Sequence, residues 1–177
     1  MIRAAWYWTS VGERDEREAP SFGEQALAHA DSLYNLARYL TGSAADGEDL
    51  VQETYARALG AAASFDGRNL KAWLFKILRN AFIDSARRRK RHPEGPIDAD
   101  RLRDDVAVDA LRNVVAADIE AALMTLSDDA RAVILLDLEG LTELEVADVL
   151  GCAVGTVKSR LSRARMLLRR QLKDYAR

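Results

Sequence analysis

Hydrophobic residues recur at helical spacing along most of this chain. From residue 22 to residue 41 the apolar side chains fall three and four positions apart, which predicts a first helix over this range. A second run of the same kind ends at Gly60, and a third begins near Asn69 and continues to Arg91. The inward positions of these three predicted helices include Leu27, Leu33, Leu40, Leu50, Thr54, Leu59, Leu74, Ile77 and Leu78.

Helical spacing resumes at about Val114 and continues to Leu126. Ser127 precedes two aspartates, a sequence that favours a helix start, and Gly140 ends the helix that follows. No stretch alternates polar and apolar residues with period two over a useful length, so we predict an all-α fold. The residues of the Ser127-capped helix predicted to face inward are Ala132, Val133, Leu135, Leu136 and Leu138.

The predicted helices fall into two groups. Residues 93–113 contain two of the three prolines and a run of aspartates, a composition typical of a linker. We therefore predict two small helical domains, over residues 22–92 and 114–177, joined by a short acidic linker. Residues 1–21 are predicted to form an N-terminal extension.

The last two predicted helices form a helix-turn-helix. Residues 142–145 read Thr-Glu-Leu-Glu, the sequence of a capping box, and Gly151 supplies a sharp turn after the short helix that it starts. The following helix, over residues 154–170, buries one apolar stripe and presents a polar, basic face. Groups near the start of such a helix reach base edges, whereas later arginines contact phosphates. The base-reading candidates are Lys158, Ser159 and Ser162, and the backbone candidates are Arg160, Arg163, Arg165, Arg169 and Arg170.

One edge of the helix that begins near Asn69 combines an aromatic ring, an amide and cations. At 100° per residue, Lys76, Asn80 and Arg87 lie within about 60° of Trp73. Such a mixture suits unstacked single-stranded nucleic acid, because aromatic rings stack on bases and cations follow the backbone. A plainer interpretation stays open, in which Trp73 is a core residue and the basic run at residues 87–91 is a solvated helix end.

Acidic residues gather at the start of the second predicted helix. Asp46, Glu48, Asp49 and Glu53 lie where the helix dipole stabilises negative charge, and neither histidine stands at ligand spacing from them. This disfavours a catalytic or metal site. The cluster is therefore either a solvated helix face or a docking surface for a basic partner.

The net charge of −2 conceals a segregation of charge along the chain. Residues 1–92 carry 14 basic and 12 acidic side chains, residues 93–156 carry 4 and 15, and residues 157–177 carry 8 and 1. Two basic zones that flank an acidic middle favour two surfaces for a polyanion. Cys152 is the only cysteine, and neither a membrane span nor a secretory leader is evident, which predicts a cytoplasmic protein.

Three stretches resemble the extracytoplasmic function (ECF) group of bacterial sigma factors, within the sigma-70 family. Residues 49–54 read DLVQET, residues 69–80 read NLKAWLFKILRN, and residues 151–165 read GCAVGTVKSRLSRAR. The resemblance covers about residues 22–172 in the expected order. It implies two helical domains, called region 2 and region 4, without the intervening domain of larger sigma factors.

The resemblance also implies partners and roles for particular residues. Region 2 would bind the β′ clamp helices of core RNA polymerase and capture the melted minus-10 strand, and region 4 would contact the β flap and read the minus-35 element. The polymerase-binding candidates are Asp46, Asp49, Gln52 and Glu53. The minus-10 candidates are Phe65, Arg68, Trp73, Lys76, Asn80, Arg87 and Arg88. The minus-35 candidates are Gly155, Thr156, Lys158, Ser159, Arg160, Ser162 and Arg163.

On this interpretation the chain is not an enzyme and needs no cofactor or metal. An anti-sigma factor is the expected restraint, free protein is expected to bind promoter DNA poorly, and the acidic linker is hypothesised to hold the two DNA-binding surfaces apart or folded down until polymerase binds. Two alternatives remain. One is a stand-alone helix-turn-helix regulator, and the other is a sigma mimic that sequesters an anti-sigma factor.

Overall fold

The computed structural model describes residues 20–91 and 110–173. Within these ranges the chain forms helices and no strand, so the all-α prediction is confirmed. The predicted N-terminal extension and most of the predicted linker lie outside the described residues. The elements are α1 (Phe22–Leu27), α2 (Ala30–Thr41), α3 (Ala44–Gly60), the short 3₁₀ helix η1 (Ala62–Ser64), α4 (Leu70–Arg91), α5 (Ala110–Met124), α6 (Asp128–Leu138), α7 (Glu143–Leu150) and α8 (Val154–Gln171).

The first predicted helix is two helices rather than one. A capping box between Ser21 and Glu24 starts α1, and the His29 N–H donates to Ala26 O at 3.1 Å, a tight bond that ends the helix. The chain changes direction there, and Leu27 is 61% exposed instead of facing inward. The apolar spacing continues across this break, so periodicity alone could not locate it.

The remaining helix boundaries follow the sequence closely. Ser43 caps α3, and the left-handed Gly42 (φ +74°) closes α2 before it. Ser127 caps α6 as predicted, while α5 begins at Ala110, ahead of the predicted start at Val114.

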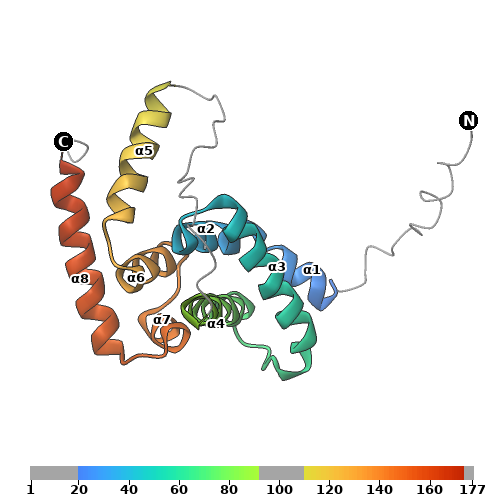
Figure 1. Ribbon diagram of the computed structural model, residues 1–177. Coiled ribbons are helices and arrows are strands. Elements are labelled where there is room, and N and C mark those ends of the chain that lie inside the picture. Colours follow the sequence, from blue (N-terminus) through green and yellow to red (C-terminus); the bar gives the residue numbers. More distant parts are fainter. Residues whose placement is uncertain (1–19, 92–109, 174–177) are drawn as a thin grey trace, which may run out of the picture.

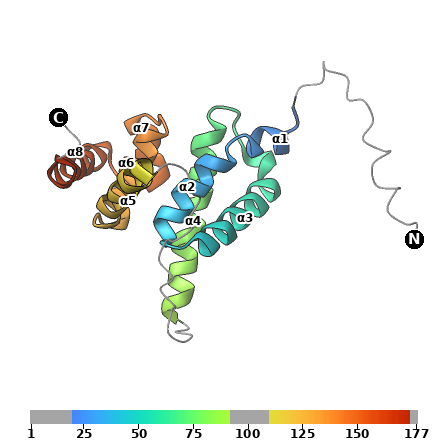
Figure 2. The ribbon, with the colours of Figure 1, turned by 90° about the horizontal axis from the view of Figure 1, so that it is seen from above.

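The two groups of helices share one hydrophobic core. Helices α1–α4 form one half of the molecule and α5–α8 the other, and α6 and α7 lie against α2 and α4 (Figures 1 and 2). A continuous cluster of buried side chains links Leu33 and Phe75 in the first half to Val133 and Val157 in the second. The two predicted domains therefore pack directly against each other.

Besides Leu27, two leucines predicted to face inward are exposed. Leu59 is 58% exposed in the last turn of α3, and Leu138 is 74% exposed as the last residue of α6. Both lie at the C-terminal end of a helix. The inward prediction is wrong at these ends and correct at helix centres, where Leu33, Leu74 and Leu78 are fully buried.

Candidate nucleic-acid and polymerase interfaces

The helix-turn-helix consists of α7, a glycine turn and α8. The Thr142 side chain accepts the Glu145 N–H, and Glu145 accepts the Thr142 N–H at 2.8 Å, which forms the predicted capping box. Gly151 adopts a left-handed conformation (φ +59°) that favours glycine, and this ends α7. In α8, Val157 and Leu161 are buried against the rest of the domain. This fixes which face of α8 points outward.

The outward face of α8 carries the minus-35 candidates. Gly155, Ser159 and Ser162 are exposed, whereas Thr156 is half-buried. Arg163 donates to the Ser159 carbonyl at 3.2 Å and to its hydroxyl at 3.2 Å, so it lies along its own helix. The seven candidates thus lie on one helix, and five of them are exposed, whereas Thr156 and Arg160 are half-buried.

Several cations of α8 already pair with carboxylates of the same domain. Lys158 Nζ lies 3.4 Å from Glu143 Oε2, and Arg160 donates to Asp129 Oδ2 at 2.7 Å. Arg165, a backbone candidate, pairs with Asp137 at 2.6 Å. A phosphate that contacts these cations would replace an internal carboxylate.

The minus-10 candidates begin at a cluster of three aromatic rings. The ring of Phe65 lies 5.4 Å from that of Trp73, and Phe22 of α1 contacts both, at 6.1 and 6.0 Å. All three rings are half-buried. Trp73 therefore packs on the core while its ring also supports the loop that contains Phe65, so the two interpretations of Trp73 are not exclusive. Sequence reasoning missed Phe22, which carried no distinguishing signal.

The other minus-10 candidates differ in exposure. Arg68 extends into solvent, with 88% of its side chain exposed, and Asn80 is exposed with no hydrogen-bond partner among the described residues. Arg87 and Arg88 are both exposed near the end of α4. Lys76 pairs with Asp148 of α7 at 2.7 Å.

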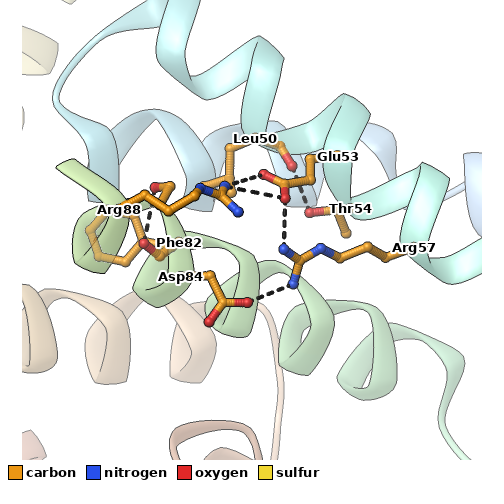
Figure 3. Close-up of polar contacts among 8 residues, drawn as sticks. Leu50, Glu53, Thr54, Arg57, Phe82, Asp84 and Arg88 are labelled. Atoms are coloured by element: carbon orange, nitrogen blue, oxygen red, sulfur yellow. Dashed lines mark hydrogen bonds and ion pairs between the residues drawn. The ribbon is translucent and has the colours of Figure 1, made fainter. Parts of the chain in front are cut away.

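The acidic cluster on α3 is mostly unpaired. Asp46, Asp49 and Gln52 are exposed, and none of their side chains takes part in an ion pair in the described part of the chain. Glu53 differs, because it accepts from Arg57 at 2.6 Å and lies 3.4 Å from Arg88 of α4 (Figure 3). The structure thus places one polymerase-binding candidate in contact with a minus-10 candidate.

Arg57 extends this contact into a network between α3 and α4. It bridges Glu53 and Asp84, donating to the Asp84 carboxylate at 3.0 Å (Figure 3). The hydrogen bond with Asp84 raises the pKa of Arg57, and the same bond lowers the pKa of Asp84. The network holds two helices that carry candidates of different kinds in a fixed relation.

Two further classes of site find no support in the described residues. No group of three or more His, Cys, Asp or Glu side chains there could hold a metal ion. None of the helices described is both long enough and apolar enough to cross a membrane.

Comparison with known proteins assigns the family. Residues 26–92 match the family model for sigma-70 region 2, and residues 116–168 match that for sigma-70 region 4. The ECF RNA polymerase sigma factor EcfG of Rhodopseudomonas palustris is 42% identical over 84% of this chain and 83% of its own length. The chain belongs to the ECF sigma factors. The resemblance that the three sequence stretches indicated is thereby confirmed.

The match covers different shares of two other relatives. SigW of Bacillus subtilis is 31% identical over 98% of both chains. SigE of Mycolicibacterium smegmatis is 38% identical over 91% of this chain, which spans 63% of SigE.

Two solved structures are similar to this sigma factor. The sigma factor RpoE, crystallised with the anti-sigma factor NepR from Bartonella quintana, has a TM-score of 0.71 and 37% identity over 86% of this chain and 96% of its own. CnrH, in complex with the cytosolic domain of CnrY, has a TM-score of 0.62 and 30% identity over 86% and 88% of the two chains.

Regions 2 and 4 of this sigma factor contact each other through ion pairs that all have the same direction. The cations come from region 2 and the carboxylates from the second half of the chain. Lys71 pairs with Glu139 at 2.7 Å, and Arg79 lies 3.4 Å from Asp129. Further contacts of this kind are Arg38 with Glu120 at 3.0 Å and Lys76 with Asp148 at 2.7 Å.

Uncharged groups strengthen the same contact. Asn69, whose side chain caps α4 by accepting the Ala72 N–H, also donates to Glu145 at 2.6 Å, so the starts of α4 and α7 are joined. Hydrogen bonds from the Thr142 backbone and hydroxyl, and then from Asn69, lower the pKa of Glu145. Helix α4, which carries minus-10 candidates, thus lies against α7, the first helix of the helix-turn-helix.

Arg131 is the one buried cation in the described residues. Its side chain donates to four backbone carbonyls: three at the end of α5, namely those of Leu123, Met124 and Leu126, and that of Tyr39 in α2 at 2.7 Å. Burial lowers the pKa of Arg131, and the nearby Asp128 carboxylate opposes this shift. No sequence pattern indicates this role, because a single arginine in an apolar run is equally compatible with an exposed position.

Proposed function

We propose that this sigma factor binds core RNA polymerase and directs it to promoters. One combination carries the proposal: an exposed acidic surface without internal partners and an exposed, polar recognition helix occur in the same chain. Asp46, Asp49 and Gln52 form the surface for the basic β′ clamp helices, and Glu53 joins them once its arginine partners are displaced. Charge complementarity of this kind fixes register and speeds association.

Region 4 reads duplex DNA at the minus-35 element and contacts the β flap. Lys158, Ser159 and Ser162 stand near the exposed start of α8, where side chains reach base edges in the major groove. Arg160 and Arg163 contact phosphates on either side. Gly155 and Thr156 lie in the first turn, close enough to the groove to set the depth of the helix.

Region 2 captures the melted minus-10 strand. The loop from Phe65 to Arg68 and the exposed amide of Asn80 supply the base contacts, and Trp73 supports the loop. Lys76, Arg87 and Arg88 contact the backbone of the strand. Lys76 becomes available for this contact when α7 leaves α4.

The chain itself performs no bond-forming chemistry. Polymerase makes the phosphodiester bonds in the cytoplasm, and the sigma factor positions it. Because a similar structure holds the sigma factor RpoE in complex with the anti-sigma factor NepR, we place this chain under the control of an anti-sigma factor as well.

The test combines purified chain with sigma-free bacterial core polymerase and fragmented DNA from the genome that encodes it. Discrete RNA starts that share two spaced upstream motifs are expected. Lys158→Ala should reduce these transcripts about tenfold, the loss expected for one base contact, whereas Lys173→Ala removes a comparable exposed cation and should change them little. Failure to bind core, together with tight binding of duplex DNA by the free chain, would instead establish a stand-alone regulator.

A further inference from the structure

Helix α1 begins before the part of the chain that matches the region 2 family model: Phe22 and the next three residues precede the match, which begins at residue 26. The helix is nevertheless firmly held. Ser21 and Glu24 form a complete capping box at its start, and the Tyr55 hydroxyl of α3 donates to Ala26 O at 3.2 Å. A helix of this length is marginal alone, so these contacts determine where it lies.

The consequence of fixing α1 is the position of Phe22. Its ring meets Trp73 edge to face, at 6.0 Å and 81°, and meets Phe65 at 6.1 Å and 56°. These are the separations and tilts that aromatic pairs favour. Phe22 therefore closes a triangle with the two aromatic residues proposed to serve minus-10 recognition.

Phe65 is the anchor of the loop that follows it. Asp66, Gly67 and Arg68 are exposed, and the bond from the Arg68 N–H to Asp66 Oδ1, 3.1 Å long, stays within the loop. Gly67 has a φ of +78° and open space around it, so it adds no packing. The position of the loop thus depends on how firmly the Phe65 ring is held between Phe22 and Trp73.

We propose that Phe22 is a positioning residue for base capture: from α1 it fixes Phe65, and through Phe65 it holds the loop that selects the minus-10 base. This inference rests on the proposed function of that loop. Phe22 acts on the loop and not on the base itself, so its loss relaxes base selection without removing a DNA contact.

The first experiment needs no polymerase. Amide hydrogen exchange of Phe65, whose N–H donates to Ala62 O at 3.1 Å, and of Arg68 is followed by NMR in the full chain. Phe22→Ala should speed exchange at both amides about tenfold, since it removes two aromatic pairs that each correspond to about a twofold to tenfold change in an equilibrium constant. Leu27→Ala is the matched control, because it truncates an exposed side chain of the same helix and should leave both rates unchanged.

The second experiment measures base selection by holoenzyme. Transcription is compared between a promoter found by start mapping and the same promoter with each minus-10 base replaced in turn. Phe22→Ala should reduce the discrimination at one base about fivefold, Phe22→Tyr should retain it, and Leu27→Ala should match the unmodified chain. A ratio between promoters is independent of how much of the variant is folded.

Each result decides a different point. Unchanged exchange at Phe65 and Arg68 in Phe22→Ala would overturn the positioning role whatever the chain does with polymerase. Faster exchange with full discrimination at every base would also overturn it, because the loop would then not select the base. If no holoenzyme transcription is seen with any chain, the proposed function fails, while the exchange result still decides whether Phe22 holds the loop.

Discussion

The acidic surface of α3 and the basic faces of α4 and α8 differ in how far their charges are already used. Asp46 and Asp49 are exposed and have no ion-pair partner in the described residues. Lys76, Lys158 and Arg160 each contact a carboxylate of the chain itself. The structure therefore shows a polymerase-binding candidate surface that is largely available, and several DNA-binding candidates whose charges are already paired within the chain.

Part of the charge segregation along the sequence corresponds to these ion pairs. The acidic middle of the chain supplies Asp129, Glu139 and Asp148, which lie on cations of region 2. These three carboxylates come from α6, α7 and the turn between them. The sequence-based hypothesis was that the acidic linker restrains the two DNA-binding surfaces. The linker aspartates lie outside the described residues. We expect that a free chain engages polymerase more readily than DNA.

The largest expected effect comes from breaking the joint between the two regions at Arg131. Arg131→Met leaves four backbone carbonyls without their donor and should cost about 3 kcal/mol of unfolding free energy. Urea unfolding followed by circular dichroism measures it. Arg170→Met, on the exposed side of α8, should change the unfolding free energy by less than about 0.5 kcal/mol. Equal effects of the two would contradict the role given to Arg131.

The next largest effect is expected at the unpaired acidic surface of α3. Asp49→Ala should weaken binding to core polymerase about tenfold, because it removes a charge that the interface would desolvate and pair. Glu48→Ala is the control, since Glu48 is an equally charged, exposed neighbour that points about 110° away from the centre of the acidic surface. Fluorescence anisotropy with labelled sigma factor gives both affinities. A common loss would mean that net charge, rather than this surface, governs binding.

A smaller effect is expected at Lys76, a minus-10 candidate that pairs with a carboxylate of the chain itself. Asp148→Asn frees Lys76 and should raise the affinity of the free chain for single-stranded minus-10 DNA about twofold, the range of an exposed ion pair. The gain should shrink at high salt, because screening weakens the original pair. Glu48→Gln makes the same change in net charge at an unpaired site and should give no comparable gain. An equal gain from both variants would show that net charge, and not the release of Lys76, raises the affinity.

The smallest effect is a pH dependence at the joint of α4 and α7. The pKa of Glu145 is lowered in the folded chain, so its contribution to stability is present above its unfolded pKa and is lost as the pH falls through the folded pKa. Lowering the pH from 5 to 3 should therefore reduce the unfolding free energy of Glu145→Gln less than that of the unmodified chain. The difference should be less than about 1 kcal/mol, the scale of a helix cap. Urea unfolding at several pH values tests this, and parallel curves for the two chains would contradict it.

Much of the fold followed from local sequence. The capping box at Thr142, the glycine turn and the apolar stripe of α8 are local features, and the structure has them where they were predicted. The break between α1 and α2 was not predicted, because apolar spacing continues through it. Leu59 and Leu138 were placed inward for the same reason, since periodicity does not show where a neighbouring helix ends.

The contacts between distant residues needed the structure. Helical-face arithmetic grouped Lys76 with Trp73, but it could not show that Asp148 lies 2.7 Å from Lys76 or that Phe22 contacts Trp73. Likewise, Glu53 belonged to the acidic cluster in sequence, yet its carboxylate pairs with arginines that come from its own helix and from α4. Such pairings depend on how helices cross, which residue spacing does not determine.

We expect DNA binding by this sigma factor to depend on polymerase, because its own carboxylates pair with several of the cations that DNA would contact. The most direct measurement is the affinity of one promoter duplex for the free chain and for the chain bound to core polymerase, at the same salt concentration. We expect weak binding by the free chain and much tighter, sequence-dependent binding once core polymerase is present. Equally tight and equally specific binding by the free chain would contradict it.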